Sequence, residues 1–345
     1  HKLISGGMTF DNTQSEELGR QQGQLSAVFN SPFGLGESIS LFGLARPTIK
    51  GMKGTGLDTP IRAGGVSVSV PIGHNGLTAG VSYMESMTRP GGAASSLALE
   101  ANMKSATGTI SYPIHYSRNT AAFLRASLGW TDEVQHTNTS GEDEDLSHDR
   151  VTTLRFGASV NQCKSGCLGL DFQFSRGIDV GSRSHNEAGN GTPLSRSEGK
   201  TNFSHFNFNT NYKFSPVDNY EVDLNAGGQY SLDDLLNSEQ TSITGSNKLS
   251  GFTSGSISGD EAWYIRGQLN RNYNVSNQIK LTPYVYGAAG VAYTLSPTTV
   301  EERATAAKSI GLGMKFQGLD KLFFQKTISG KVEYSKNWST GKLED

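Results

Sequence analysis

The chain has 345 residues, enough for one large β domain or two ordinary domains, and its formal net charge of −2 gives no reason to expect a nucleic-acid partner. Glycine is abundant, with 42 residues, and apolar residues make up only 35% in runs of a few residues, so a transmembrane helix of ~20 apolar residues is excluded. The informative signal is the alternation of apolar and polar residues along short segments.

This alternation predicts fifteen strands. A typical case is the segment 154–161, in which Leu154 and Phe156 alternate with Arg155 and Gly157. In chain order the predicted strands lie at 3–12, 19–30, 37–46, about 66–70, 77–87, 100–113, 120–134, 154–161, 168–174, 205–214, 219–231, 263–271, 280–293, 304–316 and 323–337.

The connections between these strands alternate in length. Short turns are predicted at 31–36, 71–76, 113–119, 161–167, 214–219 and 273–279, and longer loops at 48–59, 88–99, 135–149, 179–200 and 232–260. Short turns at one rim and long loops at the other are typical of outer-membrane barrels, with the turns periplasmic. The tryptophans Trp130, Trp263 and Trp338 all fall at the long-loop rim, as an interfacial aromatic belt would. A soluble β-sandwich or propeller is the alternative, and it leaves the unequal loops unexplained.

An open sheet in hydrocarbon leaves backbone groups unpaired, and single-chain bacterial barrels have an even number of strands. We therefore predict an all-β fold in which residues 1–345 form a monomeric transmembrane β-barrel of 16 antiparallel strands, with the closing strand outside this sequence. No signal peptide is visible at His1, which is expected of a mature or excised fragment.

Two cysteines, Cys163 and Cys167, lie in one Lys-Ser-Gly turn. The turn offers too few ligands for a metal site. An oxidising compartment such as the periplasm favours a local disulfide, and free thiols are the alternative.

Catalytic and ligand motifs are incomplete. The run Gly34-Leu35-Gly36 lacks the third glycine of a phosphate cradle, and Gly255-Ser256-Ile257-Ser258-Gly259 misplaces its serine for a nucleophile elbow. The acidic stretch 142–149 is either a calcium loop or a solvated loop, and it lacks the ligand spacing of a defined calcium site. We expect no enzymatic activity, cofactor or metal.

The stretch 247–271 organises the chain, because a Gly/Ser-rich loop runs directly into an alternating strand. Its tail, Ser258-Gly259-Asp260 followed by Trp263, resembles the signature of two-partner secretion transporters, whose outer-membrane barrels fold one loop into the lumen. The opening residues Met8-Thr9-Phe10-Asp11-Asn12 and Asn30-Ser31-Pro32-Phe33-Gly34-Leu35-Gly36 resemble that family's first strands. The resemblance implies a gating loop made of Gly251, Phe252, Thr253, Ser254, Gly255, Ser256, Ser258, Gly259 and Asp260, and a wall facing it made of Tyr286, Ala288 and Gly290.

This sequence departs from the family pattern at one charge pair. The family's loop tip reads Val-Arg-Gly-Phe, which we match with Thr253-Ser254-Gly255-Ser256, and its partner aspartate is replaced by Ala288. Losing both charges together avoids one buried charge without a partner. We therefore expect close packing and backbone and Ser/Thr hydrogen bonds to hold the loop.

The resemblance implies a pore that exports a large partner protein, such as an adhesin, cytolysin or contact-dependent toxin, across the bacterial outer membrane, with lipid around the barrel. The family's periplasmic POTRA domains have no match in this chain. A passive porin or solute channel and an insertase of the same superfamily are the alternatives. The charged residues expected to line the lumen are Arg125, Arg155, Asp171, Lys213, Asp223 and Arg266.

Overall fold

A computed structural model of the chain describes residues 3–14, 21–46, 61–89, 99–137, 144–183, 191–276, 278–299, 301–320 and 326–340. Within them β-strands predominate, and the 3₁₀ turn η2 (Asn237–Glu239) is the helical element of the described residues. No helix in this described part is long and apolar enough to cross a membrane.

Strand follows strand in antiparallel order. The bounds are β1 (Ile4–Asp11), β2 (Gln22–Asn30), β3 (Ser38–Ala45), β4 (Ile61–Ile72), β5 (Leu77–Thr88), β6 (Leu99–Tyr116), β7 (Thr120–Thr137), β8 (Glu144–Cys163), β9 (Gly166–Ile178), β10 (Ser204–Phe214), β11 (Tyr220–Ser231), β12 (Thr241–Ser242), β13 (Ser258–Gly259), β14 (Glu261–Arg271), β15 (Tyr273–Ser276), β16 (Ile279–Tyr293), β17 (Ala304–Asp320) and β18 (Lys326–Ser339). Sixteen of these described strands form one sheet in the order β1 to β11, β14, β16, β17 and β18, with β15 paired to β16 beside this path, and β12 and β13 form a separate pair.

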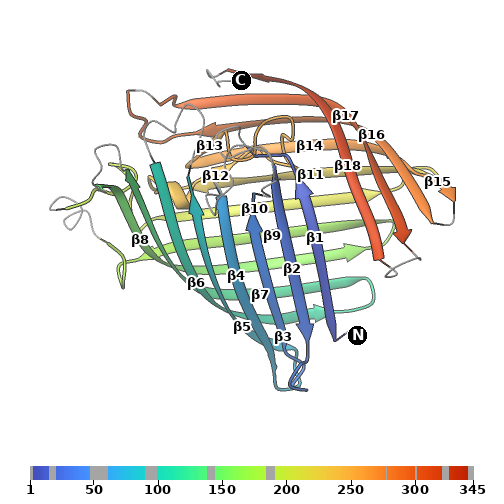
Figure 1. Cartoon of the computed structure of the whole chain (residues 1–345), viewed down its shortest axis with the longest axis horizontal. Helices are drawn as coiled ribbons and strands as arrows, with labels where there is room; N and C mark the ends of the chain where they lie inside the picture. Colours follow the sequence, from blue (N-terminus) through green and yellow to red (C-terminus); the bar gives the residue numbers. More distant parts are fainter. Residues whose placement is uncertain are drawn as a thin grey trace, which may run out of the picture.

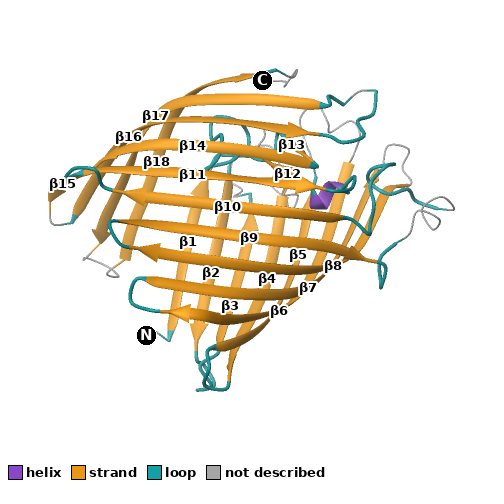
Figure 2. Ribbon diagram, turned by 180° about the vertical axis from the view of Figure 1, so that it is seen from behind, coloured by secondary structure: helices purple, strands orange, loops and turns teal. Residues whose placement is uncertain are grey.

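The large sheet curls around a lumen. Figures 1 and 2 show β1–β5 on the wall opposite β9–β11, with β12 and β13 between the walls. Among the described residues, β1 and β18 are the two ends of the sheet order. The all-β barrel architecture predicted from the alternation is confirmed, and each of the fifteen predicted strands has a counterpart.

Side-chain alternation separates the two faces of the sheet. In β14, Ile265 and Leu269 are exposed on what we call the outer face, whereas Arg266 and Gln268 are buried toward the lumen. Large apolar side chains therefore cover the outside, where a membrane protein meets lipid. Trp263 and Trp338 lie on this face too, each a little over one third exposed.

Two connections differ from the prediction. The expected turn at 273–279 contains a short strand, β15, which follows a break at Asn272 and continues the pairing with β16. The expected acidic loop at 135–149 is largely strand, because β7 runs to Thr137 and β8 begins at Glu144. In both hairpins the backbone pairing of the strands extends beyond the residues that alternate between apolar and polar. The predicted loops at 48–59 and most of 88–99 lie outside the described residues.

Candidate functional site

The connection between β11 and β14, residues 232–260, folds into the lumen, and we call it the lumen loop. Its base is closed by the pairing of β12 with β13, and the amide of Ile243 donates to the carbonyl oxygen of Ile257 at 3.0 Å. The two ends of the segment 244–256 therefore lie side by side, and the segment projects from them like the tip of a hairpin. We call this segment the excursion.

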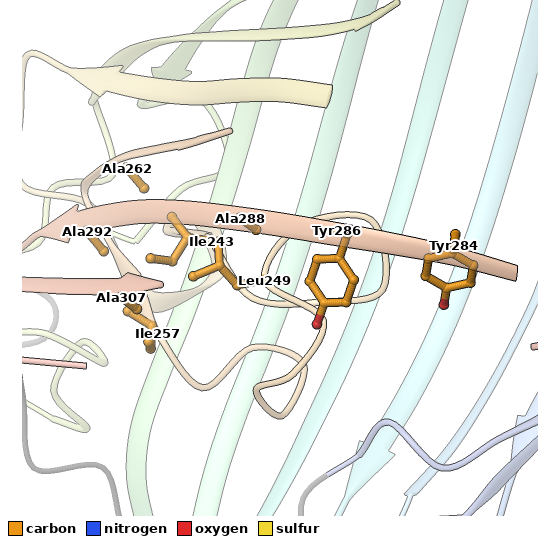
Figure 3. Packing of buried hydrophobic residues seen from close by; sticks show 9 residues of the cluster. All are labelled: Ile243, Leu249, Ile257, Ala262, Tyr284, Tyr286, Ala288, Ala292 and Ala307. Carbon is orange, nitrogen blue, oxygen red and sulfur yellow. The ribbon is translucent and has the colours of Figure 1, made fainter. Parts of the chain in front are cut away.

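Apolar packing seats this excursion against the wall formed by β16 and β17. Ile243 and Leu249 are fully buried and Ile257 is nearly so, and they form one cluster with wall residues Ala288, Ala292 and Ala307 (Figure 3). The wall residues are small for a physical reason. A Cβ added at Gly290 would lie 3.1 Å from Cδ1 of Ile243, so a larger side chain would push the loop away. Tyr286, also expected to face the loop, belongs to the same cluster.

A charged clamp made of Arg266, Ser250 and Glu333 fixes the loop next to this cluster. Arg266 lies on β14 and Glu333 on β18, and their side chains are only 2% and 10% exposed. Nη1 of Arg266 donates to the Lys248 carbonyl oxygen at 3.1 Å and to Oγ of Ser250 at 2.5 Å, while Nη2 lies 3.3 Å from Oε2 of Glu333. Ser250 Oγ in turn donates to the other oxygen of Glu333. One buried ion pair in the wall thus holds one serine of the loop.

Aromatic side chains and one amide complete the clamp. The guanidinium of Arg266 lies 3.6 Å from the centroid of the Tyr286 ring, a cation–π distance. The hydroxyl of Tyr284 donates to Oε2 of Glu333 at 2.6 Å. Nδ2 of Asn337 donates to the carbonyl oxygen of Gly251 at 2.5 Å, and a Cβ at Gly251 would lie only 1.9 Å from Oδ1 of that asparagine. Only glycine fits beside the clamp.

The expected match of Ser254 with Ala288 is not what the structure brings together. Ser254 is exposed, and its amide donates to the carbonyl oxygen of Thr13 at 3.1 Å, whereas Ala288 is buried against Leu249. The serine that faces the wall charges is Ser250, within Leu249-Ser250-Gly251-Phe252, a better match to Val-Arg-Gly-Phe four residues earlier in the chain. In this chain the cation of the site is Arg266, which lies on the wall strand β14.

The base of the lumen loop is held by the carboxylate of Asp260, which is fully buried. It accepts hydrogen bonds from Nη1 of Arg196 at 2.6 Å and from the amides of Leu235 and Leu295 at 3.0 and 2.9 Å. Arg196 belongs to the stretch predicted as a long polar loop at 179–200. The loop itself agrees with the structure, since no strand lies between β9 and β10 in the described residues, but its second half is partly buried, because Leu194 packs in a cluster with Val151, Phe203, Leu235 and Leu236.

A second ion pair ties the lumen loop to β8, on another part of the sheet. Nη2 of Arg155 on β8 lies 2.7 Å from Oε1 of Glu239, and the other carboxylate oxygen is 3.3 Å from Nε2 of His205. Burial raises the pKa of Glu239, but the hydrogen bond with His205 and the charge of Arg155 outweigh it and leave that pKa below its usual value. The carboxylate therefore stays ionised in the folded protein.

The other charges predicted for the lumen pair with one another away from the loop. Arg125 pairs with Asp171, and Lys213 lies 3.2 Å from Glu221 and 3.5 Å from Asp223. Of the six charged residues predicted for the lumen, Arg155 and Arg266 donate hydrogen bonds to the lumen loop. Among the described residues, no group of three or more His, Cys, Asp or Glu side chains is placed to hold a metal ion.

Sequence reasoning missed Ser250, Arg196 and Glu239. The Leu-Ser-Gly-Phe run would have identified Ser250, had the family motif been aligned on its glycine and phenylalanine. No local pattern marks Arg196 or Glu239, because their partners lie far away in sequence and meet them only in the folded chain.

Cys163 and Cys167 form a disulfide across the turn between β8 and β9. We expect thiol-reactive reagents to leave both residues unmodified under denaturing, non-reducing conditions and to modify both after reduction, as mass spectrometry would record. Replacing both with serine is expected to destabilise the fold by no more than about 2 kcal/mol, because so short a closed loop restricts the unfolded chain little. Full modification before reduction would mean that the thiols are free.

Comparison with known proteins gives one family and several structures. The family model of the haemolysin secretion/activation proteins ShlB, FhaC and HecB matches residues 1–314. No curated protein matches the chain. CdiB from Escherichia coli superposes with a TM-score of 0.72 at 16% identity, over 98% of this chain and 63% of that one. CdiB from Acinetobacter baumannii gives 0.63 at 16% identity, over 98% and 66%. BamA from Haemophilus ducreyi lacking POTRA domains 1–3 gives 0.59 at 11% identity, over 98% and 71%. The chain thus spans slightly less than two thirds of each CdiB, and these similarities concern the fold.

Proposed function

Because the chain belongs to the haemolysin secretion/activation protein family ShlB/FhaC/HecB, we propose that it forms the outer-membrane pore through which a large partner protein is exported in two-partner secretion. The family is one of outer-membrane transport channels and not of enzymes. The observation that carries the proposal is the lumen loop, docked inside the sheet by the clamp and by Asp260.

In this proposal the lumen loop is the gate. The excursion between Ile243 and Ile257 contacts the wall through a dry apolar patch around Leu249 and a charged clamp at Ser250. Glu239, nearer the start of the loop, is held by Arg155 on β8, so opening the gate requires that the clamp and this ion pair are both released. Folding of the partner outside the cell then makes its passage irreversible without a nucleotide.

The test is export by the full-length protein. Cells lacking the protein should retain the large secreted protein encoded by the neighbouring gene in the periplasm, and re-expression should return it to the cell surface, as immunoblots of fractions would show. Planar-bilayer recordings of the purified protein should show low conductance. Steady high conductance together with unaffected export would support a passive porin. Loss of unrelated outer-membrane proteins from the membrane would support an insertase.

The orientation of the barrel is tested by cysteine labelling. Ser197 is exposed in a long connection and Asp218 in a short turn, and these lie at opposite rims. We expect a membrane-impermeant maleimide to label S197C on intact cells and D218C only after the outer membrane is permeabilised. The native cysteines, joined as a disulfide, give no background. The reverse labelling pattern would invert the proposed orientation.

A further inference from the structure

An apolar groove crosses the outer face of the sheet over β14, β16, β17 and β18. Its volume is about 500 Å³. The strand register places Leu269, Val285, Leu312 and Tyr334 in one row and Met314 and Val332 in the next. All six side chains are between 42% and 76% exposed. The alternate residues of the same strands, Arg266, Tyr284 and Glu333, face the lumen clamp, so the groove lies on the opposite face, toward the lipid.

Arg271 closes this groove at the short-turn rim. A lumen position would suit its charge, but it has the parity of Leu269 and lines the groove on the outer face. Its guanidinium lies over two aromatic rings, 5.3 Å from the centroid of Tyr220 and 4.8 Å from that of Tyr273. Within the described residues, no carboxylate forms an ion pair with it. A fixed cation flanked by tyrosines thus stands at the end of an apolar groove.

We propose that this groove binds one glycerophospholipid, with an acyl chain along the apolar rows and the phosphate on Arg271. An arginine at a membrane interface needs an anionic partner, and its planar guanidinium matches the oxygens of a phosphate. Tyrosines prefer the depth of the lipid headgroups. Basic pockets beside membrane-spanning segments recognise acidic headgroups in the same way. The contiguous apolar surface distinguishes a lipid from a free phosphate ion, which has nothing to place in the groove.

The test is retention of phosphatidylglycerol by the detergent-purified protein, counted by native mass spectrometry. The wild-type protein should hold one lipid, and R271Q should lower its apparent affinity about tenfold, the equivalent of one charge-assisted hydrogen bond. L312W should lower it similarly, because the indole fills the groove. Two matched changes on other parts of the outer face, R62Q on β4 and L128W on β7, should leave retention unchanged; both residues are exposed.

Three results would overturn the proposal. Equal retention by R271Q and R62Q would remove the role of Arg271. Retention of diacylglycerol as strong as that of phosphatidylglycerol would show that no phosphate is recognised, and release of the lipid by millimolar inorganic phosphate would show that the groove contributes nothing. Folding of each variant is checked by the electrophoretic shift that unheated barrels show. If R271Q fails this check, R271K takes its place, and it should retain the lipid better than R271M does.

Discussion

Replacing Gly245–Gly255 with two glycines is expected to raise single-channel conductance several-fold and to abolish export of the partner protein. The replaced segment carries Leu249 and Ser250, and so the apolar patch loses its central residue and the clamp loses its serine. The closure is geometrically simple, because Ile243 and Ile257 are already hydrogen-bonded at the base, and a two-residue glycine turn can join their neighbours. The pore opens, and the element proposed to respond to the client is gone.

A matched control keeps the loop and changes its exposed tip. Ser254 and Ser256 are exposed and make no contact through their side chains with the described wall, so S254A/S256A should leave conductance and export close to the wild-type levels. Conductance that is unchanged after the glycine replacement would place the segment outside the pore and would count against the gating role.

The double exchange S250R/R266S moves the arginine of the clamp from the wall to the loop. We expect it to restore the docking of the loop, which each single exchange weakens. R266S removes the buried cation beside Glu333 and leaves it Lys331, which is partly exposed and 3.3 Å away. The loss of the hydrogen bonds from Arg266 to the loop should destabilise the docked loop by about 2 kcal/mol. S250R sets a second guanidinium beside Arg266, whose Nη1 lies 2.5 Å from the serine oxygen, with one carboxylate for both. In S250R/R266S the loop arginine meets Glu333 directly, because the oxygen of Ser250 already contacts that carboxylate.

Export, conductance and the free energy of unfolding should each report this coupling. The loss of stability in the double variant should be smaller than the sum of the losses in the two single variants. The difference should be about 1 to 3 kcal/mol, as for residues in contact. R125S serves as the control, because Arg125 also faces the lumen and pairs with a carboxylate but does not touch the loop. Simple additivity would mean that Ser250 and Arg266 do not form one site.

The strands of the barrel wall could be predicted from sequence, because the alternation of apolar and polar residues is a local pattern within each strand. Alternation alone assigns Ile265 and Leu269 to the outside and Arg266 to the lumen, and the structure agrees. Arg271 shows the limit of the method. Its charge led to the prediction that it faces the lumen, but it lies with Leu269 on the outer face, where two tyrosine rings flank it.

The docking of the lumen loop was predictable in outline and not in detail. The resemblance implies a loop that faces Tyr286, Ala288 and Gly290, and the buried cluster contains the first two with Ile243 against the third. The clamp depends on Glu333, which follows Ser250 by 83 positions. No periodicity within one strand reports such a contact, because it arises when three strands and one loop meet.

Asp260 gives the rim of the barrel a cooperative character. Its buried carboxylate is satisfied only when the segments that carry Arg196, Leu235 and Leu295 are all in place. A desolvated carboxylate lacking any of these donors is costly, so partly assembled rims are disfavoured relative to both the complete rim and the open one. The connections that surround the mouth of the pore therefore order and disorder as one unit, and a disturbance at any one of them reaches the base of the lumen loop without crossing the barrel wall.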